Sequence, residues 1–305
     1  MSAVPEPERT GRLALSDGRA LGWAEWGPKD GTPIVLCPGA GTSRRLGFRE
    51  QALEELGVRL VSADRPGLGV SDPAPRRTLL DWADDVAELA RARALGRPAI
   101  IGYSQGAPFA LACAARGIAA AVAVVAGSDE LAAPVFADVL PPELGELVVR
   151  ARTDPDGVEA EFARIDAERL WTMVMDMSAE VDRAIYREPP FARAYRAALA
   201  EGFRQGSRGY ARDAVPAMTP WPFEVARITV PLDLWYGRQD TSPVHSPDFG
   251  ETLAARVPTA RRHLEDNAGG AILWTHGAAI LRTLIGRVRH PWGCAAASRE
   301  TDLSL

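Results

Sequence analysis

The residues that could carry out covalent chemistry in this chain centre on one serine. Residues 100–106 read Ile-Ile-Gly-Tyr-Ser-Gln-Gly, so that Ser104 has a glycine two positions before it and another two positions after it. The apolar residues before the serine predict a buried strand, and the small residues 107–116 predict a helix. A serine on a strand-to-helix turn of this kind is typical of a nucleophile elbow, in which a strained backbone exposes the hydroxyl. We therefore predict that Ser104 is a nucleophile.

The elements around Ser104 alternate between strands and helices. Runs that are apolar throughout indicate strands buried on both faces, and their alternation with helical patterns predicts a parallel sheet with crossover helices. These runs are 34–37, 58–63, 99–101 and 119–126. Between the second and third run, Thr78 can cap a helix together with Asp81. Upstream, Asp17-Gly18 is a turn signal that predicts an antiparallel hairpin within residues 12–26.

The pattern changes after residue 129. Residues 130–222 have a helical pattern broken by prolines, and strand-helix alternation then returns from residue 228 to a final helix at about 274–288. The simplest account is one α/β domain, made of residues 1–129 and 223–290, that carries an inserted helical lid at 130–222. The small and polar residues 291–305 predict a mobile tail.

The chain resembles the α/β-hydrolase fold superfamily, and more narrowly its lidded, epoxide-hydrolase and proline-iminopeptidase-like esterases and peptidases. The resemblance covers about residues 10–288. Besides the elbow, residues 33–44 resemble the segment that holds the oxyanion loop, residues 64–71 (Asp-Arg-Pro-Gly-Leu-Gly-Val-Ser) resemble the turn D-x-P-G-x-G-x-S, and residues 234–240 resemble the strand and loop that deliver the catalytic acid. The resemblance implies a mostly parallel twisted sheet flanked by helices, an inserted all-helical lid, and neither a cofactor nor a metal.

The resemblance also implies which backbone groups stabilise the negative charge that develops during acyl transfer. They are the N–H of Gln105, which follows the nucleophile, and the N–H of Ala40 in the oxyanion loop. The family's usual His-Gly pair in this loop reads Pro38-Gly39 here. Because the second donor is a main-chain group, the absence of that histidine does not abolish the oxyanion hole.

Asp240 is the acid that the resemblance implies, with the task of orienting a histidine and stabilising its charged form. Asp129, at the end of the preceding parallel strand, is the alternative, since some family members take their acid from there. The family places its catalytic histidine just after the last strand, but Gly270 stands at that position in this chain. The expected base is therefore absent from its usual place.

The chain's four histidines are the whole set of candidate bases, and they are His245, His263, His276 and His290. His263 and His290 are expected to be structural or surface residues. His276 keeps the chain order Ser, Asp, His and is our provisional base, although a helical path would carry it roughly 9 Å beyond the expected point. His245, five residues after Asp240, is one alternative. The other is that no histidine contacts Ser104.

Composition limits the partners and the location of the protein. With 35 basic and 40 acidic residues the formal net charge is -5, which disfavours nucleic-acid binding. No apolar run approaches the roughly 20 residues that span a bilayer. Three widely spaced cysteines fit neither a disulfide framework nor a zinc site. We therefore expect a cytoplasmic protein that binds neither nucleic acid nor membrane.

The predicted lid is rich in methionine and aromatic residues. These residues either pack the lid's own core or line an adaptable apolar pocket for a medium-sized organic substrate. They are Trp171, Met173, Met175, Met177, Tyr186, Phe191, Tyr195 and Phe203. Four arginines, Arg44, Arg45, Arg76 and Arg77, are expected to be solvated surface charges.

Two functional hypotheses follow. The first is a lidded serine hydrolase of small or medium hydrophobic esters, lactones or amides, which works through an acyl-Ser104 intermediate with Asp240 as acid and His276 as provisional base. The second is a fold relative that has lost hydrolysis and serves as a ligand-binding protein, or as a lyase or cyclase in secondary metabolism. The second hypothesis rests on Gly270 and Pro38, which stand where the family has histidines.

Overall fold

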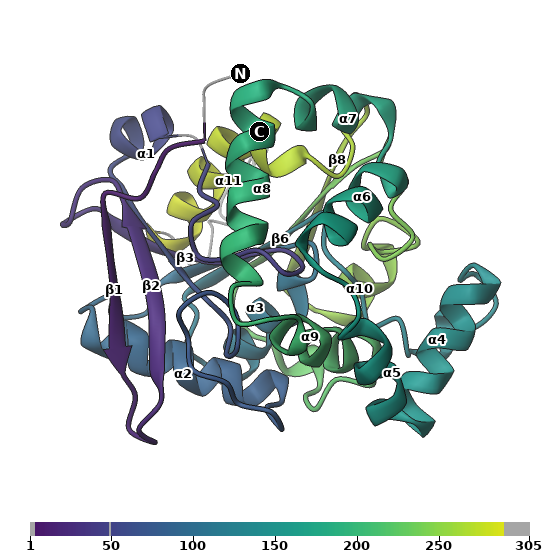
Figure 1. Cartoon of the computed structure of the whole chain (residues 1–305). Helices are drawn as coiled ribbons and strands as arrows, with labels where there is room; N and C mark the ends of the chain where they lie inside the picture. The colour runs from purple at the N-terminus through teal and green to yellow at the C-terminus, as the bar shows by residue number, and fades with distance from the viewer. Residues whose placement is uncertain (1–3, 49, 290–305) are drawn as a thin grey trace, which may run out of the picture.

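Eight strands form one sheet that runs through the whole molecule (Figure 1). The computed structural model describes residues 4–48 and 50–289. The strands are β1 (Arg9–Ala14), β2 (Ala20–Trp26), β3 (Thr32–Cys37), β4 (Val58–Ala63), β5 (Ala99–Tyr103), β6 (Ala121–Val125), β7 (Leu232–Gly237) and β8 (Ala260–Glu265). Their order in the sheet is β1-β2-β4-β3-β5-β6-β7-β8. The β1–β2 and β2–β4 pairs are antiparallel and all the other pairs are parallel, which confirms the predicted fold class.

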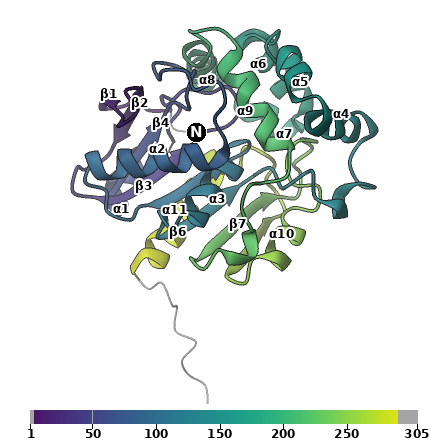
Figure 2. The same cartoon turned by 90° about the horizontal axis from the view of Figure 1, so that it is seen from below.

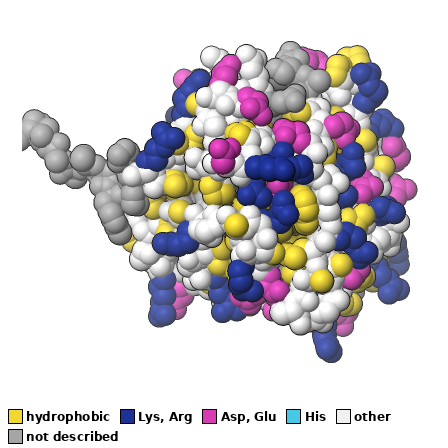
Figure 3. All heavy atoms as spheres, turned by 90° about the vertical axis from the view of Figure 1, so that its left-hand side faces the viewer, with side chains coloured by type: hydrophobic (Ala, Val, Ile, Leu, Met, Phe, Trp, Pro, Cys, Tyr) yellow, Lys and Arg dark blue, Asp and Glu magenta, His cyan; other side chains and the backbone are white. Residues whose placement is uncertain are grey.

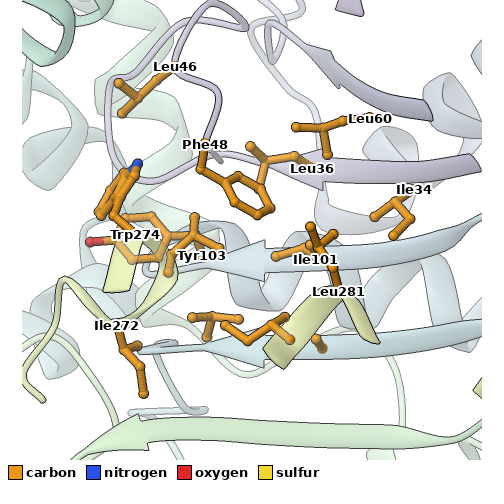
Figure 4. Packing of buried hydrophobic residues seen from close by; sticks show 14 of the residues in the cluster. Ile34, Leu36, Leu46, Phe48, Leu60, Ile101, Tyr103, Ile272, Trp274 and Leu281 are labelled. Carbon is orange, nitrogen blue, oxygen red and sulfur yellow. The ribbon is translucent and has the colours of Figure 1, made fainter. Parts of the chain in front are cut away.

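Helices cover both faces of this sheet, because successive strand residues point to opposite sides. Ile101 and Tyr103 of β5 join one buried cluster and Ile100 joins the other. Helices α1 (Glu50–Leu56) and α11 (Ile272–Arg289) pack in the first cluster, and α2 (Leu79–Ala92), α3 (Gly106–Ala115) and α10 (Glu251–Arg256) pack in the second. Figure 4 shows the first cluster, in which Trp274 of α11 lies against Tyr103 with ring centroids 4.8 Å apart. The central strands are thus buried on both faces, as their continuous apolar runs predicted.

The six helices between β6 and β7 gather on one side of the molecule (Figure 2). They are α4 (Pro142–Thr153), α5 (Pro155–Phe162), α6 (Ala167–Met177), α7 (Glu180–Tyr186), α8 (Pro189–Gly202) and α9 (Arg208–Met218), with short 3-10 turns at Pro134–Phe136 and Val225–Arg227. The N–H of Ser43 donates to Ala198 O at 3.1 Å, and that of Gly69 donates to Gly202 O at 3.0 Å. These bonds join the end of α8 to the loops that follow β3 and β4. We call residues 130–222 the inserted helices.

Charged side chains of both signs are interspersed with apolar ones on the face seen in Figure 3. Exposed ion pairs such as Arg45–Glu6, at 2.6 Å, contribute little to stability because water screens them. No helix within the described residues is long and apolar enough to cross a membrane. The predicted mobile tail at 291–305 lies outside the described residues.

Two of the arginines predicted to be solvated are buried instead. Arg44 is 6% exposed and lies 2.6 Å from the carboxylate of Asp64, and Arg77 is 4% exposed and pairs with Asp213. The prediction was wrong for these two residues because their partners come from segments distant in the sequence. Charge runs in a sequence do not show which members meet a buried carboxylate after folding.

Candidate active site

Ser104 occupies the sharp turn between β5 and α3. Its backbone φ is +50°, in the left-handed region that residues other than glycine rarely adopt. The flanking glycines allow this turn to sit against its neighbours. A Cβ on Gly102 would lie 2.7 Å from Ala107 Cα, and one on Gly106 would lie 2.0 Å from Cys37 O. The strained backbone therefore holds the serine side chain at the carboxyl end of the sheet, as an elbow does.

A continuous hydrogen-bonded chain links Ser104 to a histidine and a carboxylate. Ser104 Oγ is 2.9 Å from His245 Nε2, and His245 Nδ1 is 2.6 Å from Asp240 Oδ2. His245 is 8% exposed, so its ring is largely shielded from water. This is the geometry in which a histidine can take a proton from the serine while the carboxylate fixes its tautomer. Of the candidate bases, His245 is the one that the structure brings to Ser104.

The loop after β7 supplies both Asp240 and His245. Asp240 Oδ1 accepts the N–H of Ser242 at 3.0 Å, and the N–H of His245 donates to Ser242 O at 3.2 Å. The next N–H, of Ser246, donates to Gly127 O at 2.9 Å and ties the loop to the end of β6. Because the loop folds back on itself in this way, His245 lies over Ser104 while it also contacts Asp240.

Gly270, at the position where the resemblance implied a histidine, faces the same pair of residues. A Cβ on Gly270 would lie 3.2 Å from Asp240 Oδ1 and 3.3 Å from His245 Cε1. The His245 ring therefore lies in the space that a side chain at position 270 would enter.

The provisional base, His276, does not contact Ser104, which corrects that prediction. Its Nδ1 is 2.9 Å from Thr275 Oγ1, its Nε2 is 3.7 Å from Glu265, and its side chain is 33% exposed. The physical reason is that α11 begins at Ile272, two residues after Gly270, so His276 is carried along a helix. His263 bonds Asp233 at 2.8 Å and stacks on Trp235, as expected of a structural residue. His290 lies outside the described residues.

Asp129, the alternative acid, is buried beside the site and does not reach His245. One carboxylate oxygen accepts the N–H of Glu130 at 2.7 Å, and the other accepts from Ser246 Oγ at 3.4 Å. Burial raises the pKa of Asp129 from its ordinary value of 3.8 to about 6. Among the described side chains of the loop that carries His245, the one that donates a hydrogen bond to Asp129 is Ser246.

The raised pKa of Asp129 gives a testable pH dependence of stability. Below about pH 4 the Asp129 carboxyl is neutral in both the folded and the unfolded chain. Between about pH 4 and pH 6 it ionises in the unfolded chain but stays largely neutral in the folded one. The free energy of unfolding therefore falls as the pH rises through this range. Asp129→Asn removes this ionisation and keeps an acceptor for Glu130. We expect the variant to gain up to roughly 3 kcal/mol of unfolding free energy over the wild type between pH 4 and pH 8, measured by urea unfolding. A difference that stays constant with pH would contradict this account.

Two backbone N–H groups beside Ser104 have no hydrogen-bond partner within the described residues. They belong to Ala40 and Gln105, which line the same cavity as Ser104. A backbone N–H is a strong hydrogen-bond donor, so two that have no protein partner beside a nucleophile are free to bind an oxygen atom. The structure thus brings the two predicted oxyanion donors to the serine.

A cavity of about 200 Å³ lies between the inserted helices and the carboxyl ends of the parallel strands. Ala40, Ser104, Ser128, Asp240 and Gly270, which line it, follow five different strands. Of the methionine and aromatic residues singled out by the sequence, Met173, Met177, Tyr186 and Tyr195 line the cavity. The others, Trp171, Met175, Phe191 and Phe203, belong to or pack against the buried cluster that also contains strand residues and α11, so they join the inserted helices to the sheet side of the molecule.

Asp182 of α7 is a site residue that sequence reasoning missed. Its side chain lines the cavity, is 1% exposed, and accepts the N–H groups of Gly270 and Ala271, each at 2.9 Å. Burial raises the pKa of Asp182, while these two N–H groups favour its charged form. The carboxylate holds the two residues that precede α11 and joins α7 to the loop that faces Asp240. No local sequence signal marks it, because its partners lie nearly ninety residues away.

The charged side chains that line the cavity are acidic. Asp182 and Asp240 are lining residues, together with His245, and no lysine or arginine of the described chain lines the cavity. Among the same residues, no group of three or more His, Cys, Asp or Glu side chains is placed to hold a metal ion. The site is therefore an apolar chamber whose fixed charge is negative.

A serine-histidine-aspartate chain at the carboxyl ends of a mostly parallel sheet defines the class of protein as an α/β-hydrolase. The chain belongs to the alpha/beta hydrolase family, whose family model matches residues 34–282. It is 32% identical over 154 residues to the non-heme chloroperoxidase of Streptomyces lividans, a match that covers 50% of this chain and 51% of that protein. It is 30% identical over 121 residues to the proline iminopeptidase of Neisseria gonorrhoeae, covering 37% of this chain and 38% of the relative.

Solved structures with the same fold include an esterase and an enol-lactonase. An esterase from Rhodococcus sp. ECU1013 matches 92% of this chain and 99% of its own, with a TM-score of 0.64 and 20% identity. An enol-lactonase from Burkholderia xenovorans LB400 matches 92% of this chain and 100% of its own, with a TM-score of 0.64 and 21% identity. At such low identity these likenesses establish the fold and leave the substrate open.

Proposed function

We propose that this protein is a serine hydrolase that cleaves neutral, largely apolar esters, lactones or amides through an acyl-Ser104 intermediate. The observation that carries the proposal is the hydrogen-bonded chain Ser104–His245–Asp240 beside the two unpaired N–H groups of Ala40 and Gln105. The esterase and enol-lactonase that share the fold support the same reaction class.

The reaction divides the work among these groups. Ser104 Oγ attacks the substrate carbonyl carbon while His245 Nε2 takes the hydroxyl proton, and the oxyanion that forms accepts hydrogen bonds from Ala40 and Gln105. The carbon–heteroatom bond then breaks and His245 gives its proton to the leaving group. Water, deprotonated by His245, hydrolyses the acyl-serine and restores the free enzyme. Asp240 stabilises the histidine each time it becomes positively charged.

The inserted helices act in this proposal as the predicted lid over residues 130–222. They contribute Met173, Met177, Tyr186 and Tyr195 to the cavity wall. Because these side chains exclude water, the polar interactions at the reacting carbonyl are stronger than they would be in solvent. Both described cysteines, Cys37 and Cys113, are buried free thiols, which is consistent with the expected cytoplasmic location.

The non-hydrolytic alternative drew its support from the two missing histidines. His245 weakens the first reason because it contacts both Ser104 and Asp240. The second reason concerns Pro38, whose loop still presents the N–H of Ala40 to the cavity.

The test of the proposal combines covalent labelling with ester turnover. We expect a fluorophosphonate probe to label the wild type at Ser104, located by peptide mass spectrometry, and to leave Ser104→Ala unlabelled. Because the cavity wall carries carboxylates and no described lysine or arginine, a neutral ester should be hydrolysed at least about tenfold faster, in kcat/KM, than an ester of equal size that carries a carboxylate. A wild type that neither labels nor hydrolyses any acyl ester would favour the non-hydrolytic alternative.

A further inference from the structure

Arg65 is a buried cation directly behind the oxyanion loop. It follows β4, and its side chain is 0% exposed. NH1 donates to Pro38 O at 2.6 Å, NH2 donates to Gly39 O at 3.0 Å, and Nε donates to Asp213 at 2.6 Å. The face of the Phe109 ring lies 4.8 Å from the guanidinium carbon. A charge so deeply buried is tolerated only when it is paired and hydrogen-bonded, and these contacts satisfy both conditions.

The carbonyl of Gly39 determines where the N–H of Ala40 points. A peptide group is planar and trans, so its C=O and N–H point in opposite directions. Arg65 and the hydroxyl of Thr42, at 2.8 Å, both donate to Gly39 O, and neither residue lines the cavity. The N–H of Ala40, on the same peptide, therefore points away from these two donors, and Ala40 lines the same cavity as Ser104. A flip of this peptide would replace the donor by a carbonyl oxygen, which repels an oxyanion.

The counter-ion of Arg65 comes from the inserted helices. Asp213 lies on α9, is 0% exposed, and is shared with Arg77. Arg77 bonds Gly209 O at 2.8 Å and has no bond to Pro38 or Gly39. The two arginines therefore share one carboxylate, but only Arg65 reaches the oxyanion loop. Arg65 thus joins this loop to α9, because NH1 and NH2 donate to the loop while Nε donates to Asp213.

We propose that Arg65 is a positioning residue that sets the Ala40 N–H of the oxyanion hole, with Asp213 of the inserted helices as its anchor. The fork of the guanidinium matches two successive carbonyls and one carboxylate at once, which a lysine cannot do. This inference rests on the proposed serine hydrolase function. Arg65 also explains what holds the oxyanion loop in a chain that has Pro38 where the family has a histidine.

The test compares Arg65→Met with the matched variant Arg77→Met. We expect Arg65→Met to lower kcat by about 10²-fold with little change in KM, because only the transition state uses the displaced donor. The affinity for a trifluoromethyl ketone, which forms a tetrahedral adduct on Ser104, should fall by a similar factor. Arg65→Lys should recover part of both. Arg77→Met should lower thermal stability and leave kcat and inhibitor affinity near wild-type values.

Two further variants keep the test decisive. If Arg65→Met does not fold, Arg65→Gln takes its place, because an amide keeps the buried site polar while Asp213 retains its ion pair with Arg77; kcat and inhibitor affinity should again fall. Thr42→Val deletes the other donor to Gly39 O and should lower kcat by up to about tenfold with KM unchanged. The proposal is overturned if Arg65→Met keeps wild-type kcat and inhibitor affinity, or if Arg77→Met loses as much as Arg65→Met. A wild type that the fluorophosphonate does not label would instead disprove the proposed function.

Discussion

Replacing His245 by alanine is expected to lower kcat for ester hydrolysis on the order of a millionfold, the loss seen when the base of a serine hydrolase triad is removed. The reason is geometric: among the described histidines, only His245 lies within hydrogen-bond distance of Ser104 Oγ, at 2.9 Å. A residual acceleration of roughly 10³–10⁴ over water should remain from the oxyanion hole and substrate binding. The measurement is single-turnover and steady-state hydrolysis of a neutral aryl ester, with thermal unfolding to verify that the variant folds.

His276→Ala is the matched control. This histidine is partly exposed and its ring contacts Thr275 and Glu265, so we expect activity close to that of the wild type. If His276→Ala were inactive and His245→Ala active, the assignment of the base would have to be reversed. Equal and moderate losses in both variants would mean that neither ring takes the proton from Ser104.

Asp240→Asn should lower kcat by about 10⁴-fold while preserving the size of the side chain. Asp240 Oδ1 accepts the N–H of Ser242, so an asparagine keeps that bond by turning its oxygen toward Ser242 and its NH₂ toward His245. His245 Nδ1 must then act as an acceptor, which leaves the proton on Nε2. A histidine protonated at Nε2 cannot take the proton of Ser104, and the effect should therefore appear in kcat more than in KM.

Asp129→Asn separates the two candidate acids. Its carboxylate bonds Glu130 and Ser246 and does not touch His245, so the variant should keep near-normal kcat while its stability changes with pH as described above. A 10⁴-fold loss in Asp129→Asn together with an active Asp240→Asn would place the acid at the end of β6 instead.

Local patterns were sufficient to predict the fold around the site. The apolar runs became central strands because a parallel strand covered by helices on both faces has no polar side. Thr78 and Asp81 form the predicted capping box at the start of α2, with the Thr78 side chain accepting the N–H of Asp81. Likewise, the helical pattern of residues 130–222 contains α4 to α9. Each of these features depends on residues that are close in sequence.

The site could be predicted only where its geometry is local. Ser104 sits on a turn whose glycines are two residues away on either side, and their small size is what the close approach of Cys37 and Ala107 requires. Asp240 could be placed by its position after a strand. His245 and His276 could not be told apart, because that choice depends on the path of one loop and on where α11 begins. Asp182, on a helix nearly ninety residues away, holds the two residues just before α11.

The sequence by itself determined the sheet, the nucleophile turn and the short set of four histidines from which the base must come. Tertiary structure alone decided which of them reaches Ser104, and which buried groups hold the oxyanion loop. The physical reason is that backbone conformation and helix capping are set by neighbours along the chain. A hydrogen bond between His245 and Ser104, or between Arg65 and Gly39, instead needs segments that only the folded chain brings within about 3 Å of each other.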